Sequence, residues 1–165
     1  MQATCLVRRY GSIIVDADNH VIATGYNGAP RGQVDCLQRG VCARSNSPQG
    51  CDYSKCFSLH SEQNALLQAG RMSKGSTIYI AGIDAMDGNL VNSPPCFHCT
   101  KMMINAGIAC VVFSLFDGSI KVIKPIDMYR IYEVQLDESI CNNSCTNTTR
   151  VLSSTSDFYR HLTLN

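Results

Sequence analysis

Short apolar runs separated by turn residues recur along the chain, and their lengths are typical of β-strands. Residues 8–16 and 20–26 lie on either side of a turn rich in Asp and Asn, so we expect them to form a hairpin. Residues 77–82 and 109–114 are almost continuously apolar, which is typical of central strands of a sheet. Residues 119–123 follow an Asp-Gly turn and are expected to add a short strand or edge.

Three other stretches have the composition or spacing of helices. A run of helix formers begins after His60 and is ended by Gly70. Residues 100–106 have the same character and are ended by Gly107. Residues 127–136 place four side chains on one side of a helix, at Met128, Ile131, Tyr132 and Gln135. A hairpin followed by alternating helices and strands predicts an α/β sandwich, a mixed sheet with helices packed on its faces.

Composition indicates one folded domain. The chain has 165 residues, of which 45% are hydrophobic and 16% are charged. We assign the domain to residues 1–138 and expect residues 139–165, rich in Ser, Thr and Asn, to form a mobile polar tail. The net charge of +1 gives no strongly basic face, so nucleic acid is not an expected partner.

The sequence also bears on membrane association and on the compartment of the protein. No apolar run approaches the roughly 18 residues of a membrane span, so we expect no membrane partner. The first residues lack the apolar core of a signal peptide, which favours a cytoplasmic protein.

Candidate chemistry is concentrated in a His-x-Glu triplet and a later Pro-Cys-x-x-Cys run. Cys96 and Cys99 are three residues apart, which places both thiols on one face of a helix. With the imidazole of His60 they supply three nitrogen and sulfur ligands, and three such ligands with one open position suit a catalytic zinc. Glu62 can stand beside this metal without ligating it, take a proton from water and pass it to a leaving nitrogen.

Each motif is weak by itself, and the pair is much more specific. His-x-Glu recurs by chance, and Cys-x-x-Cys can be a redox pair or half of a structural zinc site. Here both motifs begin a predicted helix, and the positive ends of two helices would favour thiolates at one spot. We therefore interpret them as one catalytic zinc site, with its two helices side by side behind the central strands.

The cysteines outside this motif cluster in an irregular stretch, residues 33–57. A loop of this length in a compact domain is unusual unless something holds it together. A second, structural zinc is one explanation, and free buried thiols that pack as small hydrophobes are the alternative. The chain has ten cysteines in all, and without an export signal they favour a reducing compartment over a disulfide framework.

Residues 25–32, Gly-Tyr-Asn-Gly-Ala-Pro-Arg-Gly, form a predicted loop between the hairpin and this stretch. Glycines let a backbone approach a ligand closely, so we expect the loop to border a bound molecule. An ordinary surface turn is the alternative interpretation.

Together these motifs resemble the deoxycytidylate (dCMP) deaminases of the zinc-dependent cytidine deaminase superfamily. His-x-Glu with Pro-Cys-x-x-Cys is the known signature of zinc nucleobase deaminases. The resemblance covers roughly residues 3–115 and rests on five segments, residues 3–5, 25–32, 60–65, 95–99 and 104–108. It implies a cytidine-deaminase-like sandwich, a five-stranded mixed sheet with helices on both faces, and conversion of dCMP and water to dUMP and ammonia.

The resemblance also implies a role for individual residues. The zinc would be held by His60, Cys96 and Cys99, and Glu62 would shuttle protons. The substrate would be contacted by the Ser61 backbone at the base carbonyl, by Asn27 at the sugar with Asn64 near it, and by Arg31 at the phosphate.

Some of these relatives bind a second zinc and are regulated. The corresponding ligands here would be Cys5, Cys36, Cys51 and Cys56, with Cys42 as the spare thiol. Many relatives are homo-oligomers that dCTP switches on and dTTP switches off, and Mg²⁺ can accompany such a nucleotide. The implied effector loop contains Tyr26, Asn27 and Gly28.

Two departures from the pattern leave other functions open. Ser61 stands where relatives usually carry Ala, and residues 84–92 lengthen the link that borders the substrate. The alternatives are a deaminase of another cytosine or pterin-like compound, a deaminase of a base in single-stranded nucleic acid, and a non-catalytic zinc scaffold. Glu62 argues against the scaffold, because a structural site closes its fourth position with another ligand.

Overall fold

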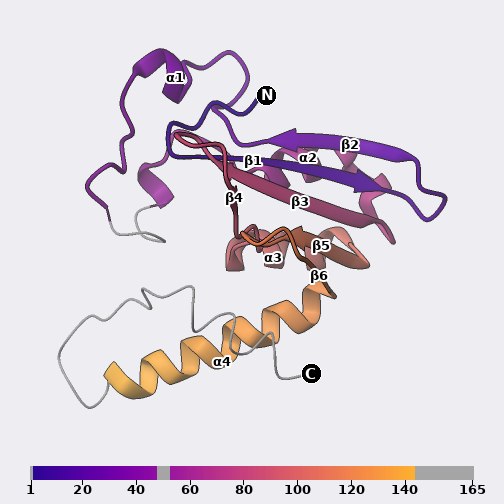
Figure 1. Ribbon diagram of the computed structural model, residues 1–165. Coiled ribbons are helices and arrows are strands. Elements are labelled where there is room, and N and C mark those ends of the chain that lie inside the picture. Colours follow the sequence, from indigo (N-terminus) through magenta and orange to yellow (C-terminus); the bar gives the residue numbers. More distant parts are fainter. Residues whose placement is uncertain (1, 48–52, 144–165) are drawn as a thin grey trace.

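The computed structural model describes residues 2–47 and 53–143, which form one sheet with helices packed against it (Figure 1). The strands are β1 (Arg8–Val15), β2 (Val21–Tyr26), β3 (Thr77–Asp84), β4 (Leu90–Val91), β5 (Cys110–Ser114) and β6 (Ile120–Ile123). The helices are α1 (Cys36–Arg39), α2 (Ser61–Ala69), α3 (Phe97–Ala106) and α4 (Pro125–Asn143), with 3-10 turns at Tyr53–Lys55 and Gly70–Ser73. No helix in this described part is both long enough and apolar enough to cross a membrane.

The strands form a mixed sheet in the order β2-β1-β3-β5-β6, with β4 paired to β3 outside this path. Strands β3 and β5 are parallel and are joined through α3, whereas the other pairs are antiparallel. The predicted hairpin of the first two strands and the mixed five-stranded path are therefore confirmed. A sixth short strand, β4, was not expected.

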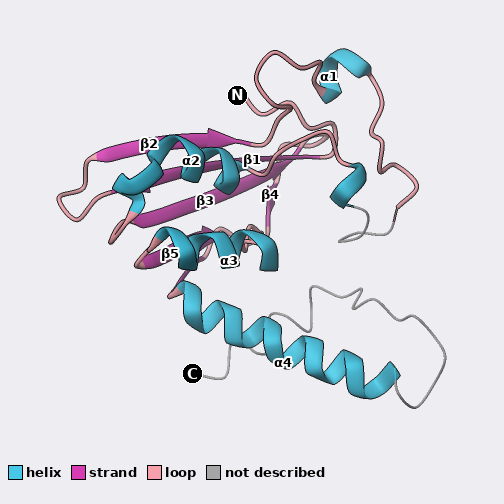
Figure 2. Cartoon of the chain, turned by 180° about the vertical axis from the view of Figure 1, so that it is seen from behind, coloured by secondary structure: helices cyan, strands magenta, loops and turns pink. Residues whose placement is uncertain are grey.

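The helices α2 and α3 cover one face of the sheet (Figure 2). Along β3, Ile78 and Ile80 are buried against them, while Tyr79 between these residues is 42% exposed. We expected helices on both faces, but the two helices packed on the sheet lie on the same face. The nearly continuous apolar sequence of β3 therefore does not mean that both of its faces are covered by the described residues.

The residues from Asp84 to Asn92 are more ordered than the sequence indicated. β3 continues to Asp84, and β4 returns alongside it with Leu90 opposite Ile83. The backbone N–H of Asp84 donates to the carbonyl oxygen of Asn89 at 2.9 Å, which closes the turn. The excursion is thus a hairpin on the end of β3.

The last helix, α4, packs on α3 and is longer than predicted. Met128 is fully buried in the core, and the Tyr132 hydroxyl donates to the carbonyl oxygen of Pro95 at 2.6 Å. Pro at the first helical position is a normal start for a helix, and Pro125 supplies it here. The helix runs past residue 138, where we placed the domain boundary, and residues 144–165 of the predicted tail lie outside the described residues.

Candidate metal and catalytic site

Two helix N-termini meet at the candidate site. His60 is the N-cap of α2 and Cys96 is the N-cap of α3, and both have extended backbone angles. The Gln63 side chain accepts from the His60 backbone N–H at 2.8 Å, and the Cys99 backbone N–H donates to the Cys96 sulfur at 3.5 Å. These local contacts fix where each helix begins, and the positive ends of both helices face the ligands.

The three predicted ligands come together in space. His60 Nδ1 lies 3.6 Å from Cys96 Sγ and 3.5 Å from Cys99 Sγ, and all three ligand atoms lie within 4.8 Å of one another. A tetrahedral zinc with bonds of about 2.0 Å to nitrogen and 2.3 Å to sulfur would separate these atoms by about 3.5 Å. The donor set therefore fits zinc in both chemistry and spacing.

The contact between the two thiols shifts their pKa values in opposite directions. A hydrogen bond from Cys99 lowers the pKa of the Cys96 thiol to about 4, and His60 adds to this effect. The same contact, together with burial, raises the pKa of Cys99. These opposite shifts favour Cys96 as the thiolate of the pair, and metal binding must displace the proton of Cys99.

Glu62 lies in the first turn of α2, beside these ligands, and is only 6% exposed. Burial raises the pKa of its carboxyl group, against the opposing effect of the nearby His60. The Ser61 hydroxyl donates to Glu62 Oε2 at 3.0 Å. Because burial favours its protonated form, this carboxyl group can hold a proton as well as accept one, which is what general acid–base chemistry requires.

The loop after β2 is anchored beside this site by two amide side chains. Asn27 accepts from the Tyr10 backbone N–H and donates to the Arg8 carbonyl oxygen, each at 2.8 Å. Asn64 donates to the Tyr26 carbonyl oxygen at 2.7 Å. Both amides tie the loop to β1 and α2 in this structure, and their contacts with a substrate stay predictions.

Two other loop residues, Gly28 and Arg31, differ in exposure. Arg31 is exposed in a turn closed by a hydrogen bond from the Gln33 backbone N–H to the Pro30 carbonyl oxygen. Gly28 is buried and pairs with Leu59 in an isolated bridge, which brings the loop to the residue preceding His60. The loop and the metal ligands are therefore neighbours, although they are far apart in the sequence.

The predicted second zinc cluster is only partly assembled. Its described thiols, Cys5, Cys36 and Cys56, are not in disulfides, and Cys51 lies outside the described residues. Burial raises the pKa of Cys36, and negative charge on Cys5, Cys56 and Cys42 adds to this rise. These thiols are thus close enough to affect one another. They do not form a set of three ligand atoms within 4.8 Å in the described part of the chain.

Sequence reasoning missed two residues beside the site. Tyr53 packs edge-on against His60, with ring centroids 5.2 Å apart, and the Arg44 guanidinium lies 4.3 Å above the Tyr53 ring. Both belong to the irregular stretch before α2, where no periodic pattern marks which side chains turn inward. Their placement depends on contacts that the sequence does not display.

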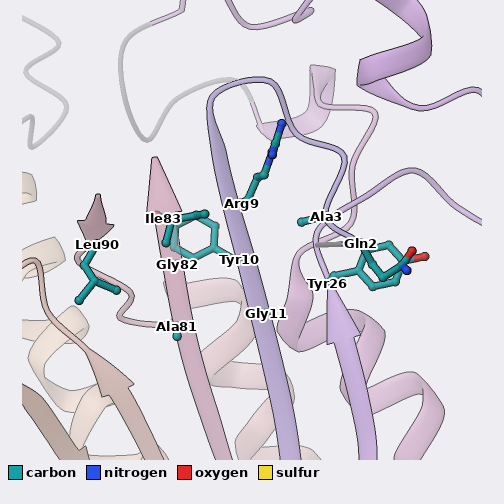
Figure 3. A pocket seen from close by; sticks show the side chains of 10 residues that line it. All are labelled: Gln2, Ala3, Arg9, Tyr10, Gly11, Tyr26, Ala81, Gly82, Ile83 and Leu90. Atoms are coloured by element: carbon teal, nitrogen blue, oxygen red, sulfur yellow. The ribbon is translucent and has the colours of Figure 1, made fainter. Parts of the chain in front are cut away.

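A separate hollow of about 270 Å³ lies at the ends of β1, β2 and β3 (Figure 3). It is lined by Gly11 and Ala81 and bordered by Tyr26, Leu90 and other apolar atoms. None of the metal ligands lines it. Tyr26 is therefore the member of the predicted effector loop that reaches this hollow.

Residues 1–115 match the family described as the cytidine and deoxycytidylate deaminase zinc-binding region. With the His60, Cys96 and Cys99 donors assembled on a mixed α/β sheet, the chain belongs to this family of zinc-binding deaminases.

Three individual relatives of the chain are deoxycytidylate deaminases. A deoxycytidylate deaminase of Schizosaccharomyces pombe is 38% identical over 114 residues, which are 68% of this chain and 32% of the relative. That of Saccharomyces cerevisiae is 36% identical over 129 residues, 74% of this chain and 37% of the relative. That of Mycobacterium phage D29 is 33% identical over 120 residues, 68% of this chain and 82% of the relative. The chain thus spans only about a third of the length of the two yeast relatives.

Among solved structures, the apo form of a dCMP deaminase from the cyanophage S-TIM5 is 26% identical. The match covers 64% of this chain and 65% of that chain, with a TM-score of 0.42. This overlap is too low to add to the family assignment, which rests on the sequence match and the ligand geometry.

Proposed function

We propose that this chain is a zinc-dependent deaminase that converts dCMP and water to dUMP and ammonia. The observation that carries the proposal is the three-donor site of His60, Cys96 and Cys99, with the buried carboxyl group of Glu62 beside it. Support for the substrate comes from relatives named deoxycytidylate deaminase, which share 33–38% identity with the chain.

The proposed mechanism assigns each step to a residue of the site. Zinc held by His60, Cys96 and Cys99 would supply Lewis-acid activation of water, which lowers the pKa of that water from near 16 toward roughly 7. Glu62 accepts the proton that this water gives up and delivers it to the ring nitrogen next to the reacting carbon. The oxygen left by this deprotonation bonds to the reacting ring carbon, and Glu62 then moves the second proton of that oxygen to the departing amine. The C–N bond breaks, and ammonia leaves as the carbonyl of the product forms. The Ser61 backbone would hold the base carbonyl in place during these transfers.

The remaining substrate contacts are proposed around the loop after β2. Asn27 would meet the sugar, and Asn64 would lie near it. The supporting observation is that Asn27, in the loop after β2, bonds to Tyr10 of β1, and that Asn64, on α2 near Glu62, bonds to the Tyr26 carbonyl oxygen at the start of the same loop. Arg31 would meet the phosphate, which its exposed side chain can reach without loss of a buried contact.

A second zinc is proposed to hold the irregular stretch, with Cys5, Cys36, Cys51 and Cys56 as ligands and Cys42 as the spare. The supporting observation is that the described thiols Cys5, Cys36, Cys42 and Cys56 are free and at least partly buried. Metal ions pull such thiols into tetrahedral contact by replacing their protons.

Regulation by dCTP and dTTP, with Mg²⁺ accompanying the nucleotide, is proposed at the loop of Tyr26, Asn27 and Gly28. Tyr26 and Arg9 line the hollow of Figure 3, and the buried Nε of Arg9 has no hydrogen-bond partner among the described residues. A phosphate or base oxygen would supply the missing acceptor.

Assembly into a homo-oligomer is also proposed, and apolar residues exposed on the face of the sheet opposite α2 and α3, among the described residues, support it. The strand register places Ile13, Tyr79, Val112 and Val122 in one row across β1, β3, β5 and β6. Ile13, Tyr79 and Val122 in this row are 42–67% exposed. An apolar patch of this width is typical of an interaction surface. Sedimentation measured over a range of protein concentrations tests the oligomer.

The decisive experiment for the activity is a substrate panel of dCMP, deoxycytidine, cytidine and a single-stranded oligonucleotide, each with and without dCTP or dTTP. The proposal expects release of ammonia chiefly from dCMP. Preference for the oligonucleotide, with a steep dependence on salt, would instead support the nucleic-acid deaminase. No release from any substrate by the zinc-loaded protein would leave the non-catalytic scaffold as the better interpretation.

A further inference from the structure

Two buried serine hydroxyls connect the first strand to the proton-carrying carboxylate. Ser12 on β1 donates to Ser61 Oγ at 2.7 Å, and Ser61 donates to Glu62 Oε2 at 3.0 Å. Ser12 is 1% exposed and Ser61 is 0% exposed, so water does not compete for these bonds. The three side chains therefore form a continuous hydrogen-bonded chain across the contact between sheet and helix.

The direction of each hydrogen bond in this series follows from how many protons each group can donate. Each serine hydroxyl has one proton to donate, and an ionised carboxylate can only accept. Because the Ser61 hydroxyl donates its hydrogen bond to Glu62, the Ser61 oxygen is left to accept a hydrogen bond from Ser12. The charge on the carboxylate thus orders both hydroxyls, and bonds to charged acceptors are the stronger kind.

We propose that Ser12 and Ser61 are positioning residues that fix the orientation of the Glu62 carboxylate for proton transfer. The inference rests on the proposed deaminase function and adds to it a role for two side chains that the motif does not contain. Ser61 occupies the variable position of His-x-Glu, and Ser12 comes from a strand 49 residues earlier.

The physical effect is on rotation of the carboxylate. The terminal torsion of a glutamate side chain is broad, so an unrestrained carboxylate samples many orientations. With Oε2 held by Ser61, the other oxygen keeps one direction relative to the ligands. Proton transfer needs this alignment, whereas substrate affinity does not depend on it to the same degree. Loss of the hydrogen bonds from Ser12 through Ser61 to Glu62 should therefore lower kcat and leave KM nearly unchanged.

The two hydroxyls should also show coupled effects on stability. Ser61→Ala removes the acceptor of Ser12 and leaves a buried hydroxyl without its partner, which is costly. Ser12→Ala with Ser61→Ala removes both groups, and an apolar pair of similar shape can be nearly neutral. The double variant should then melt at a higher temperature than the sum of the two single shifts indicates.

The test compares the wild-type protein with Ser12→Ala, Ser61→Ala and the double variant, all loaded with zinc and checked for metal content. Ser61→Ala should lower kcat about tenfold, the size of one hydrogen bond to a charged group. Ser12→Ala should lower kcat less. In the Ser61→Ala background the Ser12 substitution should have no further effect on kcat, because Ser12 acts through Ser61.

Ser73→Ala provides the matched control. Ser73 is also 0% exposed and donates to the Gly70 carbonyl oxygen at 2.7 Å, but it lies in the 3-10 turn that follows α2. It should lower the melting temperature without changing kcat. An unchanged kcat in Ser61→Ala, or equal effects of Ser12→Ala in both backgrounds, would overturn the inference.

The melting temperatures separate this inference from the function on which it rests. If wild-type protein deaminates nothing in the panel, the proposed function fails, and the four melting temperatures still test the hydrogen-bonded chain. Non-additive shifts then uphold the coupling of Ser12 to Ser61, and additive shifts overturn it.

Discussion

Gly25 of β2 lies directly against the first turn of α2, so close that a methyl group at residue 25 would overlap the carbonyl oxygen of Ser61. The same methyl group would also lie 2.5 Å from the backbone nitrogen of Ala65. Both obstacles are helix backbone, which cannot turn aside as a side chain can. The position of α2, and with it that of His60 and Glu62, therefore depends on the absence of a side chain at residue 25.

Gly25→Ala should consequently push α2 away from the sheet. We expect it to lower the free energy of unfolding by about 1–3 kcal/mol, the usual cost of overpacking, and to weaken zinc binding. Urea unfolding and zinc titration measure the two effects. Gly11→Ala is the control, since a methyl group there would lie an ordinary 4.0 Å from the Gly25 carbonyl oxygen. Equal behaviour of the two variants would contradict this account of the helix position.

Glu62→Gln should separate chemistry from folding. The amide keeps the size of the side chain and an oxygen that can accept from Ser61, but it cannot accept the proton from water. We expect kcat to fall by about 10²–10⁴-fold with zinc content and melting temperature retained. Gln68→Glu on the exposed side of α2 makes the reverse exchange and should leave turnover unchanged. Near-normal turnover of Glu62→Gln would rule out the assigned role.

Metal analysis should count the zinc sites. We expect two zinc ions per chain if the cysteine cluster binds metal, and one if only the catalytic site does. Cys99→Ala should remove the catalytic zinc and all activity, whereas Cys36→Ser should remove the other zinc and retain activity while the fold persists. Chelation should lower the melting temperature, because a ligand bound only by the native state stabilises it. A chelator-treated protein with an unchanged melting temperature would contradict metal binding by the folded chain.

Met128→Ala should show that α4 is part of the folded core. The Met128 side chain is fully buried, and its truncation should cost about 2–5 kcal/mol of unfolding free energy. Ile126→Ala, two residues earlier and 43% exposed, is the control and should cost much less. Urea denaturation of both variants measures the difference. Similar values would mean that α4 is not packed on α3 in solution.

The phosphate contact can be assigned by comparing nucleotide with nucleoside. If Arg31 meets the phosphate, Arg31→Ala should raise KM for dCMP about tenfold or more and leave deoxycytidine unaffected. Arg44→Ala is the informative comparison, because Arg44 lies above Tyr53, which packs on His60. Loss of nucleotide preference in Arg44→Ala alone would move the phosphate contact from Arg31 to Arg44.

The sequence predicted the parts of this protein that local patterns determine. Each ligand motif begins a helix because its first ligand, His60 or Cys96, is the extended N-cap residue, and Gly70 and Gly107 end the two helices. The apolar runs at β3 and β5 marked the parallel pair at the centre of the sheet. In each case the signal lies within about ten residues, which is the range of helix and strand periodicity.

What could not be predicted depends on long-range contacts. Ser12 reaches Ser61 across 49 residues, and no local pattern announces such a contact. β4 is only two residues long, and its pairing with β3 depends on the turn at Asp84 rather than on apolar periodicity. The apolar sequence of β3 indicated burial on both sides, yet burial depends on which helices are present to cover each face. Tyr79, for example, lies within β3 and is 42% exposed.

The cap positions of His60 and Cys96 give the metal a second effect on the chain. These residues are 36 positions apart, so an ion bound to both closes a loop that contains α2, β3 and β4. A covalent bridge closing a loop of this size restrains the unfolded chain by about 4 kcal/mol in the chain-entropy treatment. The ion would thus stabilise the fold as well as take part in the reaction. Protein synthesised under zinc starvation should therefore be less stably folded as well as inactive.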